Sequence, residues 1–263
     1  MDPLLMAPRA PVLERGVPHA AEQVFEVHWA RDLGDVRAAQ RLRYGVFATE
    51  MGARLEAPAG VPPGHDADRF DDSCEHLLVR TLSPAREVVG TYRVLTPEAA
   101  RRAGGLYTET EFDIETLRPV LGRAVELGRS CVHPDWRSGG VVIALWAALG
   151  EFMLRHDLDT MIGCASIGLQ DGGHAAASLW SRLRETHPAP AAWRAVPRRP
   201  LPVESLRQDL DPEVPPLIKG YLRCGARVLG APAWDPEFNV ADLPLLMRFE
   251  ELPARYRKHF LGR

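Results

Sequence analysis

The sequence predicts a mixed α/β fold in which helices flank one central, mixed and twisted sheet. Strand-like segments follow one another in the first half of the chain, at residues 75–82, 87–95 and 124–132. Strand and helix then alternate over residues 124–186, which is the order of a parallel crossover. With 263 residues, 46% of them hydrophobic and 25% charged, the chain is long enough to bury one large core.

The N-terminal half supplies the first strands. Residues 1–22 are rich in Pro and Ala without periodicity and predict a flexible arm, followed by a single domain over residues 23–263. The pattern then predicts a strand at 24–29, a helix at 35–49 with one apolar face, and a Pro/Gly/Asp loop at 57–72. The two strands at 75–82 and 87–95 form a hairpin around Ser83-Pro84.

The C-terminal half alternates helices and strands. Helices are expected at 142–156, 173–186 and 217–226, and strands at 124–132, 160–167, 227–234 and 242–249. Residues 187–216 are rich in Pro and Arg and predict a surface loop or lid.

A last helix at residues 253–261 is basic and amphipathic. It suits contact with an anionic bilayer, contact with an acidic carrier protein or plain packing on the core, and the pattern leaves these three open.

Composition excludes several classes of function. The net charge of −3 and the absence of a basic motif with interleaved aromatics argue against nucleic acid as a partner. The four cysteines are far apart and form no Cys-x-x-Cys pair, so neither a disulfide framework nor a metal site is expected. The N-terminus lacks the pattern of a secretory signal, and the apolar stretch at 138–150 is too short to span a bilayer. A cytoplasmic protein is therefore expected, with membrane contact only peripheral, at the inner face of the cytoplasmic membrane.

Residues 124–146 hold the strongest functional signal. Glu126 and Arg129 are charges inside an otherwise apolar strand, and Gly128 between them predicts a bulge or a close backbone approach. The turn at 134–140 leads into an apolar helix, whose first N–H groups are free to bind an anion. The junction is therefore a place where an acyl thioester can be held.

Further charges gather in three places. Arg43 and Phe47 lie four residues apart on the first helix, HDADRFDD covers residues 65–72, and Arg93 sits inside a strand. Solvated turns and structural ion pairs are the plain interpretation. Two arginines and a glutamate in successive strands also fit an active site, because desolvated charges need partners and active sites accumulate them.

The turn from Arg137 to Val142 resembles the R/Q-x-x-G-x-G/A element of the GCN5-related N-acetyltransferase (GNAT) fold. Arg137 and Gly140 match, and Val142 replaces the last small residue. In that fold the turn holds the pyrophosphate of coenzyme A. The larger residue leaves less room for a diphosphate, which leads to the hypothesis that the donor is phosphopantetheine on a carrier protein, with one phosphate.

Eight ordered blocks, from about residue 25 to the end, resemble the bacterial L-ornithine N-alpha-acyltransferases, a hemolysin-like GNAT-fold family. They are LRYGVFATEMGA, DRFDDSCEHLLV, VVGTYRVL, LYTETEFDI, VELGRSCVHPDWR, MIGCASI, LIKGYLRCGA and FNVADL. The resemblance implies transfer of a 3-hydroxy fatty acyl group from acyl carrier protein to L-ornithine, the first step of ornithine lipid biosynthesis. It implies no bound cofactor, since the acyl carrier protein thioester is itself a substrate.

A related family, the acyl-homoserine lactone synthases, has a charged and aromatic pattern that this chain matches at Arg43, Phe47, Asp68, Asp71, Arg93, Glu126 and Arg129. Ala53 stands where those synthases have a characteristic Trp, which favours the ornithine interpretation. Lactone synthesis, acylation of another amino acid such as glycine, and a non-catalytic acyl-carrier-binding module are the alternatives.

Aminolysis of a thioester requires a base for the ammonium proton and stabilisation of the oxyanion, and needs no metal. Glu126 is the candidate base, and Arg129 and Ser130 are grouped with it as catalytic candidates. No Gly-x-Ser-x-Gly or Cys–His signature supports a covalent nucleophile. The backbone at Cys131 and Val132 is expected to polarise the carbonyl, and the turn residues hold the phosphate, namely Arg137, Ser138, Gly139 and Gly140.

The acceptor is expected to bind among the remaining charges. Asp68 and Asp71 are suited to the two amines of ornithine. Arg43 or Arg93 is suited either to its carboxylate or to pairing with those two acids, and Phe47 completes the substrate-binding set.

Overall fold

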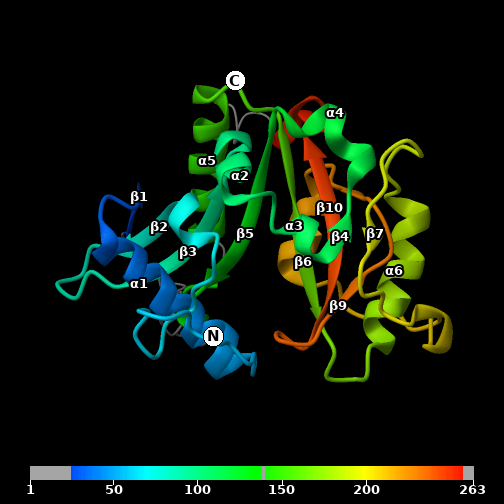
Figure 1. Ribbon diagram of the computed structural model, residues 1–263, viewed down its shortest axis with the longest axis horizontal. Helices are drawn as coiled ribbons and strands as arrows, with labels where there is room; N and C mark the ends of the chain where they lie inside the picture. The colour runs from blue at the N-terminus through cyan, green and yellow to red at the C-terminus, as the bar shows by residue number, and fades with distance from the viewer. Residues whose placement is uncertain (1–24, 138–139, 257–263) are drawn as a thin grey trace, which may run out of the picture.

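The computed structural model describes residues 25–137 and 140–256, and its centre is an eight-stranded sheet (Figure 1). The strand order is β1-β2-β3-β5-β6-β10-β8, with β9 paired to β10. The strands are β1 (Phe25–Trp29), β2 (Glu75–Thr81), β3 (Val88–Leu95), β5 (Ala124–Val132), β6 (Thr160–Gly168), β8 (Arg227–Val228), β9 (Ala233–Asp235) and β10 (Val240–Arg248). β5 and β6 pair in parallel and the other neighbouring strands pair antiparallel, so the predicted mixed sheet is confirmed.

Helices cover both faces of this sheet. They are α1 (Leu33–Tyr44), which continues as the π-helix η1 (Gly45–Glu50), α2 (Pro97–Ala103), α3 (Thr108–Glu111), α4 (Arg118–Leu121), α5 (Gly140–Arg155), α6 (His174–Thr186) and α7 (Pro216–Arg223). Because side chains alternate along a strand, Val125 and Leu127 pack with α5 on one face while Ala124 packs with α2 on the other. Below, these are called the α5 face and the α2 face.

The two parallel strands part after a short ladder. β5 and β6 pair at residues 124–126 and 160–162, and both strands then continue, β5 along β3 and β6 along β10. Figure 1 shows them diverging from this point. At Gly163 the backbones still touch, since a Cβ there would lie 2.4 Å from the carbonyl oxygen of Leu127. The parting leaves an opening in the middle of the sheet.

A β-bulge interrupts β5 just beyond this opening. Arg93 of β3 lies opposite Gly128 and Thr91 lies opposite Cys131, so one β3 residue faces both Arg129 and Ser130. Arg129 has a φ of 49°, the left-handed conformation in which non-glycine residues are uncommon. The bulge predicted near Gly128 is confirmed, one residue further along.

Several boundaries differ from the predictions. The expected strand at 227–234 is split into β8 and β9. The polar segment at 96–123 contains α2, α3, α4 and the short strand β4 (Phe112–Asp113), none of which was predicted. Thr96 caps α2 by accepting a hydrogen bond from the N–H of Ala99, and proline follows it at the first helical position, a recognisable start signal.

The predicted loop at 187–216 is mostly irregular and is tied to the sheet edge. Its short strand β7 (Val196–Pro197) pairs with β4, and the N–H of Ala195 donates to the oxygen of Leu229. The N-terminal arm and residues 257–261 of the expected last helix lie outside the described residues. Within the described ranges, none of the helices is long and apolar enough to cross a membrane.

Candidate active site

Glu126 is the last residue of β5 that pairs with β6, and its carboxylate points to the α2 face. The side chain is buried, and three donors hold it at the start of α3. The N–H of Tyr107 donates to Oε2 at 2.7 Å, while the N–H and hydroxyl of Thr108 donate to Oε1 at 2.6 and 2.5 Å. Burial raises the pKa of Glu126, and the three hydrogen bonds oppose that rise. A fixed carboxylate with a raised pKa is suited to accept a proton.

Three arginines and three aspartates form a buried ion-pair network beside Glu126 on the same face. Arg43 pairs with Asp66 and Asp71, each at 2.8 Å, and its side chain is fully buried. Arg93 pairs with Asp68 at 2.6 Å and with Asp71 at 3.3 Å. Every member is thus paired inside the protein, as buried charges require.

The expectation that Asp68 and Asp71 bind the amines of ornithine meets this network, in which both acids are paired with arginines. Burial disfavours their charged forms, but the neighbouring arginines hold the pKa of both carboxyls below the usual value. Their oxygens face guanidinium groups in this structure, so a substrate ammonium at either acid would compete with these ion pairs. Of the two roles open for Arg43 and Arg93, the structure shows the pairing with these acids.

Arg129 joins the network because of the bulge. Its side chain lies 3.3 Å from Asp66 and 3.1 Å from Asp68, on the face that carries Glu126. The guanidinium also lies over the ring of Phe238, 4.6 Å from the centroid, and that ring packs edge-on against Phe47 at 5.7 Å. Phe47 and Arg129 therefore both contact the ring of Phe238.

Ser130 faces the other way. Its hydroxyl bonds to the hydroxyl of Tyr92, which is buried on the α5 face and also contacts Tyr221 of α7. Ser130 and Glu126 therefore lie on opposite faces of β5, so the two candidates are not side by side.

The predicted donor turn is only partly described, because Ser138 and Gly139 lie outside the described residues. Arg137 donates from both terminal nitrogens to Glu50, at 2.6 and 2.7 Å, and from Nε to the oxygen of Val132 at 3.0 Å. Gly140 is exposed at the first turn of α5. A donor phosphate at Arg137 would compete with the Glu50 carboxylate for the guanidinium group.

The strand residues expected to polarise the thioester carbonyl have packed side chains. Cys131 packs with Leu42 and Val46 of the first helix, and Val132 packs in the core on the α5 face. Their backbones pair with Thr91 and Gly90 of β3. These two residues can therefore take part in donor binding only through their backbone groups.

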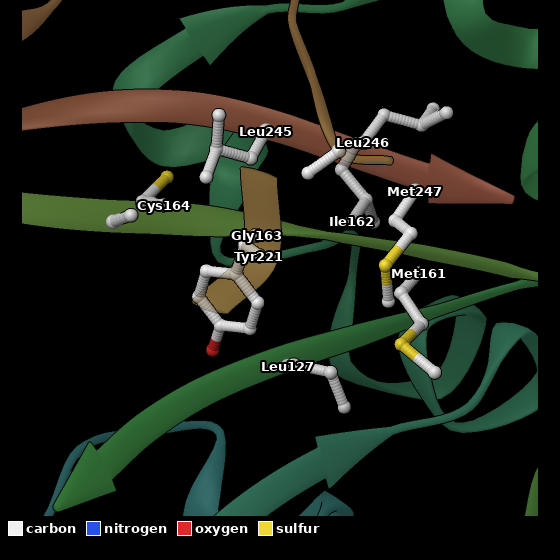
Figure 2. Close-up of a pocket in the computed structure, with 11 residues that line it drawn as sticks. Leu127, Met161, Ile162, Gly163, Cys164, Tyr221, Leu245, Leu246 and Met247 are labelled. Atoms are coloured by element: carbon white, nitrogen blue, oxygen red, sulfur yellow. The ribbon is translucent and has the colours of Figure 1, made fainter. Parts of the chain in front are cut away.

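An apolar cavity of about 40 Å³ lies where β5 and β6 part. Leu127 of β5, Gly163 of β6 and Tyr221 of α7 are among its lining residues. Figure 2 shows the two strands close together near Met161 and further apart toward Cys164, with the Tyr221 ring between the strands that carry Cys164 and Leu127. The lining of this cavity is apolar, as the start of an acyl chain requires.

Sequence reasoning missed several residues that build the site. Thr108 and Tyr107 fix Glu126, and Asp66 pairs with two arginines although only its neighbours were singled out. Asp242 is buried inside the apolar strand β10. A charge inside an apolar strand was the signal that identified Glu126, and the same signal was available for Asp242.

Comparisons with known proteins agree with this geometry. Residues 42–147 match the profile of the Acetyltransferase (GNAT) domain. Among solved structures, the coenzyme A-dependent acyl-homoserine lactone synthase BjaI has a TM-score of 0.53 at 18% identity and covers 91% of this chain and 89% of its own. FeeM, an N-acyl amino acid synthase from uncultured soil microbes, has a TM-score of 0.51 at 12% identity and covers 91% and 96%. The GNAT fold predicted from the sequence is confirmed.

An opened parallel strand pair beside a buried carboxylate, within this fold, defines an acyltransferase of the GNAT class. A protein of Brucella abortus named L-ornithine N(alpha)-acyltransferase is 39% identical over 252 residues, which are 90% of this chain and 88% of the relative. The relative of that name from Rhodobacter capsulatus is 35% identical over 93% of this chain and 97% of its own. The chain belongs to the family of the L-ornithine N(alpha)-acyltransferases.

Proposed function

We propose that the protein transfers a 3-hydroxy fatty acyl group from acyl carrier protein to the α-amino group of L-ornithine, giving lyso-ornithine lipid. The observation that carries this proposal is the buried Glu126 carboxylate, which stands on β5 directly before β5 and β6 part. Relatives that align over about nine-tenths of the chain carry the name L-ornithine N(alpha)-acyltransferase, which supports ornithine as the acceptor.

The chemistry is direct aminolysis. The α-amino nitrogen attacks the thioester carbonyl carbon, the C–N bond forms, and the C–S bond breaks. Glu126 first takes one proton of the α-ammonium, so that the neutral amine attacks, and the phosphopantetheine sulfur leaves as a thiolate that takes the second proton released as the nitrogen becomes an amide. The positive charge of Arg93 favours the ionised form of this base.

The donor arm is proposed to enter beside α5. Backbone N–H groups near Cys131 and Val132 polarise the carbonyl, the turn from Arg137 to Gly140 binds the single phosphate, and the apolar cavity takes the start of the acyl chain. A larger hollow of about 610 Å³, lined in part by Glu50 and His133, adjoins the Arg137–Glu50 pair.

Turnover of purified protein with 3-hydroxyacyl-acyl carrier protein and a panel of L-ornithine, glycine and S-adenosylmethionine tests the proposal. Mass spectrometry should find N-α-(3-hydroxyacyl)ornithine together with free carrier thiol. A glycine product or a lactone would replace the acceptor assignment, and binding without turnover would make the protein a carrier-binding module. The donor assignment fails if acyl-coenzyme A supports the same rate.

A further inference from the structure

A second group of acids lies on the α2 face, and its members lack the arginine partners of the first group. Asp242 of β10 is 3% exposed and Asp235 of β9 is 6% exposed. Glu111, the last residue of α3, is half-buried. They are electrostatic neighbours, since Asp242 and Asp235 both act on the carboxyl of Glu111. We call these three residues the acidic group.

The contacts of the acidic group leave negative charge uncompensated. Asp242 Oδ1 accepts from the hydroxyl of Ser166 at 2.6 Å, and Asp235 Oδ1 accepts from the N–H groups of Glu237 and Phe238 at 2.8 and 3.1 Å. Among the described residues, neither Asp242 Oδ2 nor the Glu111 carboxylate has a hydrogen-bond or ion-pair partner. Within the same chain the three aspartates of the buried network each contact two arginines.

This arrangement costs stability. Burial, with the adjacent acids, raises the pKa of Glu111 to about 7, and burial with the Asp235 charge raises that of Asp242 to about 6. Arg199 acts on Glu111 and Arg129 acts weakly on Asp242, and neither compensates for the loss of water. A nearly unexposed carboxylate without a cation is uncommon, because desolvated charge needs a partner.

The acidic group adjoins the candidate base through shared neighbours. The thiol of Cys164 lies 3.9 Å from the Thr108 hydroxyl that donates to Glu126. The charges of Asp242, Glu126 and Glu111 all contribute to raising the pKa of the same thiol. Ser166, which donates to Asp242, is two residues further along β6 on the same face. Cys164 therefore stands between the two sets of carboxylates.

The geometry does not favour a metal ion. Among residues 25–137 and 140–256, no group of three or more His, Cys, Asp or Glu side chains is arranged to hold one. A primary ammonium needs no such shell, because its three N–H donors can be shared among separate carboxylates.

We propose that Asp242 and Glu111 bind the side-chain ammonium of the acceptor amino acid and thereby select an acceptor with a second amine. The proposal rests on the function proposed above. With the side-chain ammonium held at Asp242 and Glu111, the α-amino group of the same molecule reaches toward Glu126. Asp235 is a further negative charge that acts on both Asp242 and Glu111.

Competition between L-ornithine and L-norvaline tests the proposal, because norvaline has the same carbon chain without the side-chain amine. We expect the wild-type protein to prefer ornithine in kcat/KM. Asp242→Asn should lower that preference by about 10- to 100-fold, mainly through KM for ornithine, which is the scale of one hydrogen-bonded charge. Glu111→Gln should act in the same direction. Glu185→Gln, an exposed acid on α6, is the matched control and should leave the preference unchanged.

The outcomes separate this inference from the proposed function. If the wild-type protein does not acylate ornithine, the proposed function is wrong. If it does, and folded Asp242→Asn and Glu111→Gln proteins keep the full preference for ornithine, the acidic group is not the ammonium site. Glu111 is half-buried, so its variant still tests the ammonium site if the Asp242 variant fails to fold.

Discussion

Glu126 and Thr108 are joined twice, because the N–H and the hydroxyl of Thr108 both donate to the same oxygen of Glu126, at 2.6 and 2.5 Å. The two residues are 18 positions apart in the chain. The contact fixes the start of α3 against β5 and also sets the basicity of the carboxylate, so structure and chemistry depend on the same atoms.

Glu126→Gln should reduce turnover by about 10²-fold or more, the usual effect of removing a general base. The amide keeps one acceptor oxygen, while its NH₂ group faces the N–H of Tyr107 that now donates to Glu126. Steady-state kinetics on protein with unchanged circular dichroism would measure the loss. A near-normal rate would remove Glu126 from the role of base.

Thr108→Val should move the acidic limb of the kcat/KM profile to higher pH. The base works when ionised, and the Thr108 hydroxyl donates to that ionised form, so removing the hydroxyl raises the pKa of Glu126. Valine has nearly the shape of threonine, which makes it the cleanest variant here. An unmoved limb would mean that another group controls the profile.

Asp71→Asn should destabilise the protein by about 3–5 kcal/mol at pH 7, because it leaves Arg43 and Arg93 incompletely paired in the interior. The folded-state pKa of Asp71 is below its ordinary value of 3.8. Its stabilising contribution is therefore present above about pH 4 and is lost as the pH falls further. Urea unfolding at several pH values would measure both effects. The exposed Glu98→Gln variant serves as the control and should change stability little.

Asp242→Asn should have the opposite effect on stability. The ordinary pKa of 3.8 rises to about 6 in the folded protein, so ionisation of Asp242 costs stability as the pH rises from about 4 to about 6. At pH 8 the variant should exceed the wild type by up to about 3 kcal/mol, given about 1.4 kcal/mol per pH unit. Below pH 4 the two should converge. A variant that is less stable at pH 8 would show that the Asp242 carboxylate supports the fold.

Arg137→Gln should raise KM for the acyl-carrier donor by about 10-fold, the scale of one charge-assisted hydrogen bond. Glu50→Gln removes the carboxylate that now occupies Arg137 and should lower that KM, because the donor phosphate no longer competes with it. Initial rates at varied donor concentration would compare the two variants. A higher KM in Glu50→Gln would contradict donor binding at Arg137.

Much of the architecture could be predicted because local patterns determine it. The strand over Ala124–Val132 was predicted with its observed bounds, since apolar residues and flanking turns mark both ends. The bulge was predicted from Gly128, which lies between the charged Glu126 and Arg129 in an otherwise apolar strand. The small helices of residues 96–123 were not predicted, because each is only one or two turns long.

The pairing of charges could not be predicted from local patterns. Asp66 and Arg129 are 63 residues apart, and only the packing of a loop onto the sheet brings them together. The ion pairs of Asp68 were not foreseen, because Arg93 and Arg129 lie on strands far from it in the sequence. Asp68 was therefore expected to bind substrate. Asp242 was not predicted as a site residue, because its strand lies near the end of the chain, far in sequence from the junction at residues 124–146.

The bulge at Arg129 makes the length of β5 as important as its residues. In a strictly alternating strand, Arg129 would point among the apolar side chains packed under α5, and Ser130 would take its place beside Glu126. Deleting Arg129 would remove the extra residue and restore regular alternation, while Cys131 and Val132 keep their partners on β3 and their present faces. The extra residue of the bulge lets one strand present Arg129 to the ion-pair network on the α2 face and Ser130 to Tyr92 on the α5 face, without disturbing the pairing on either side.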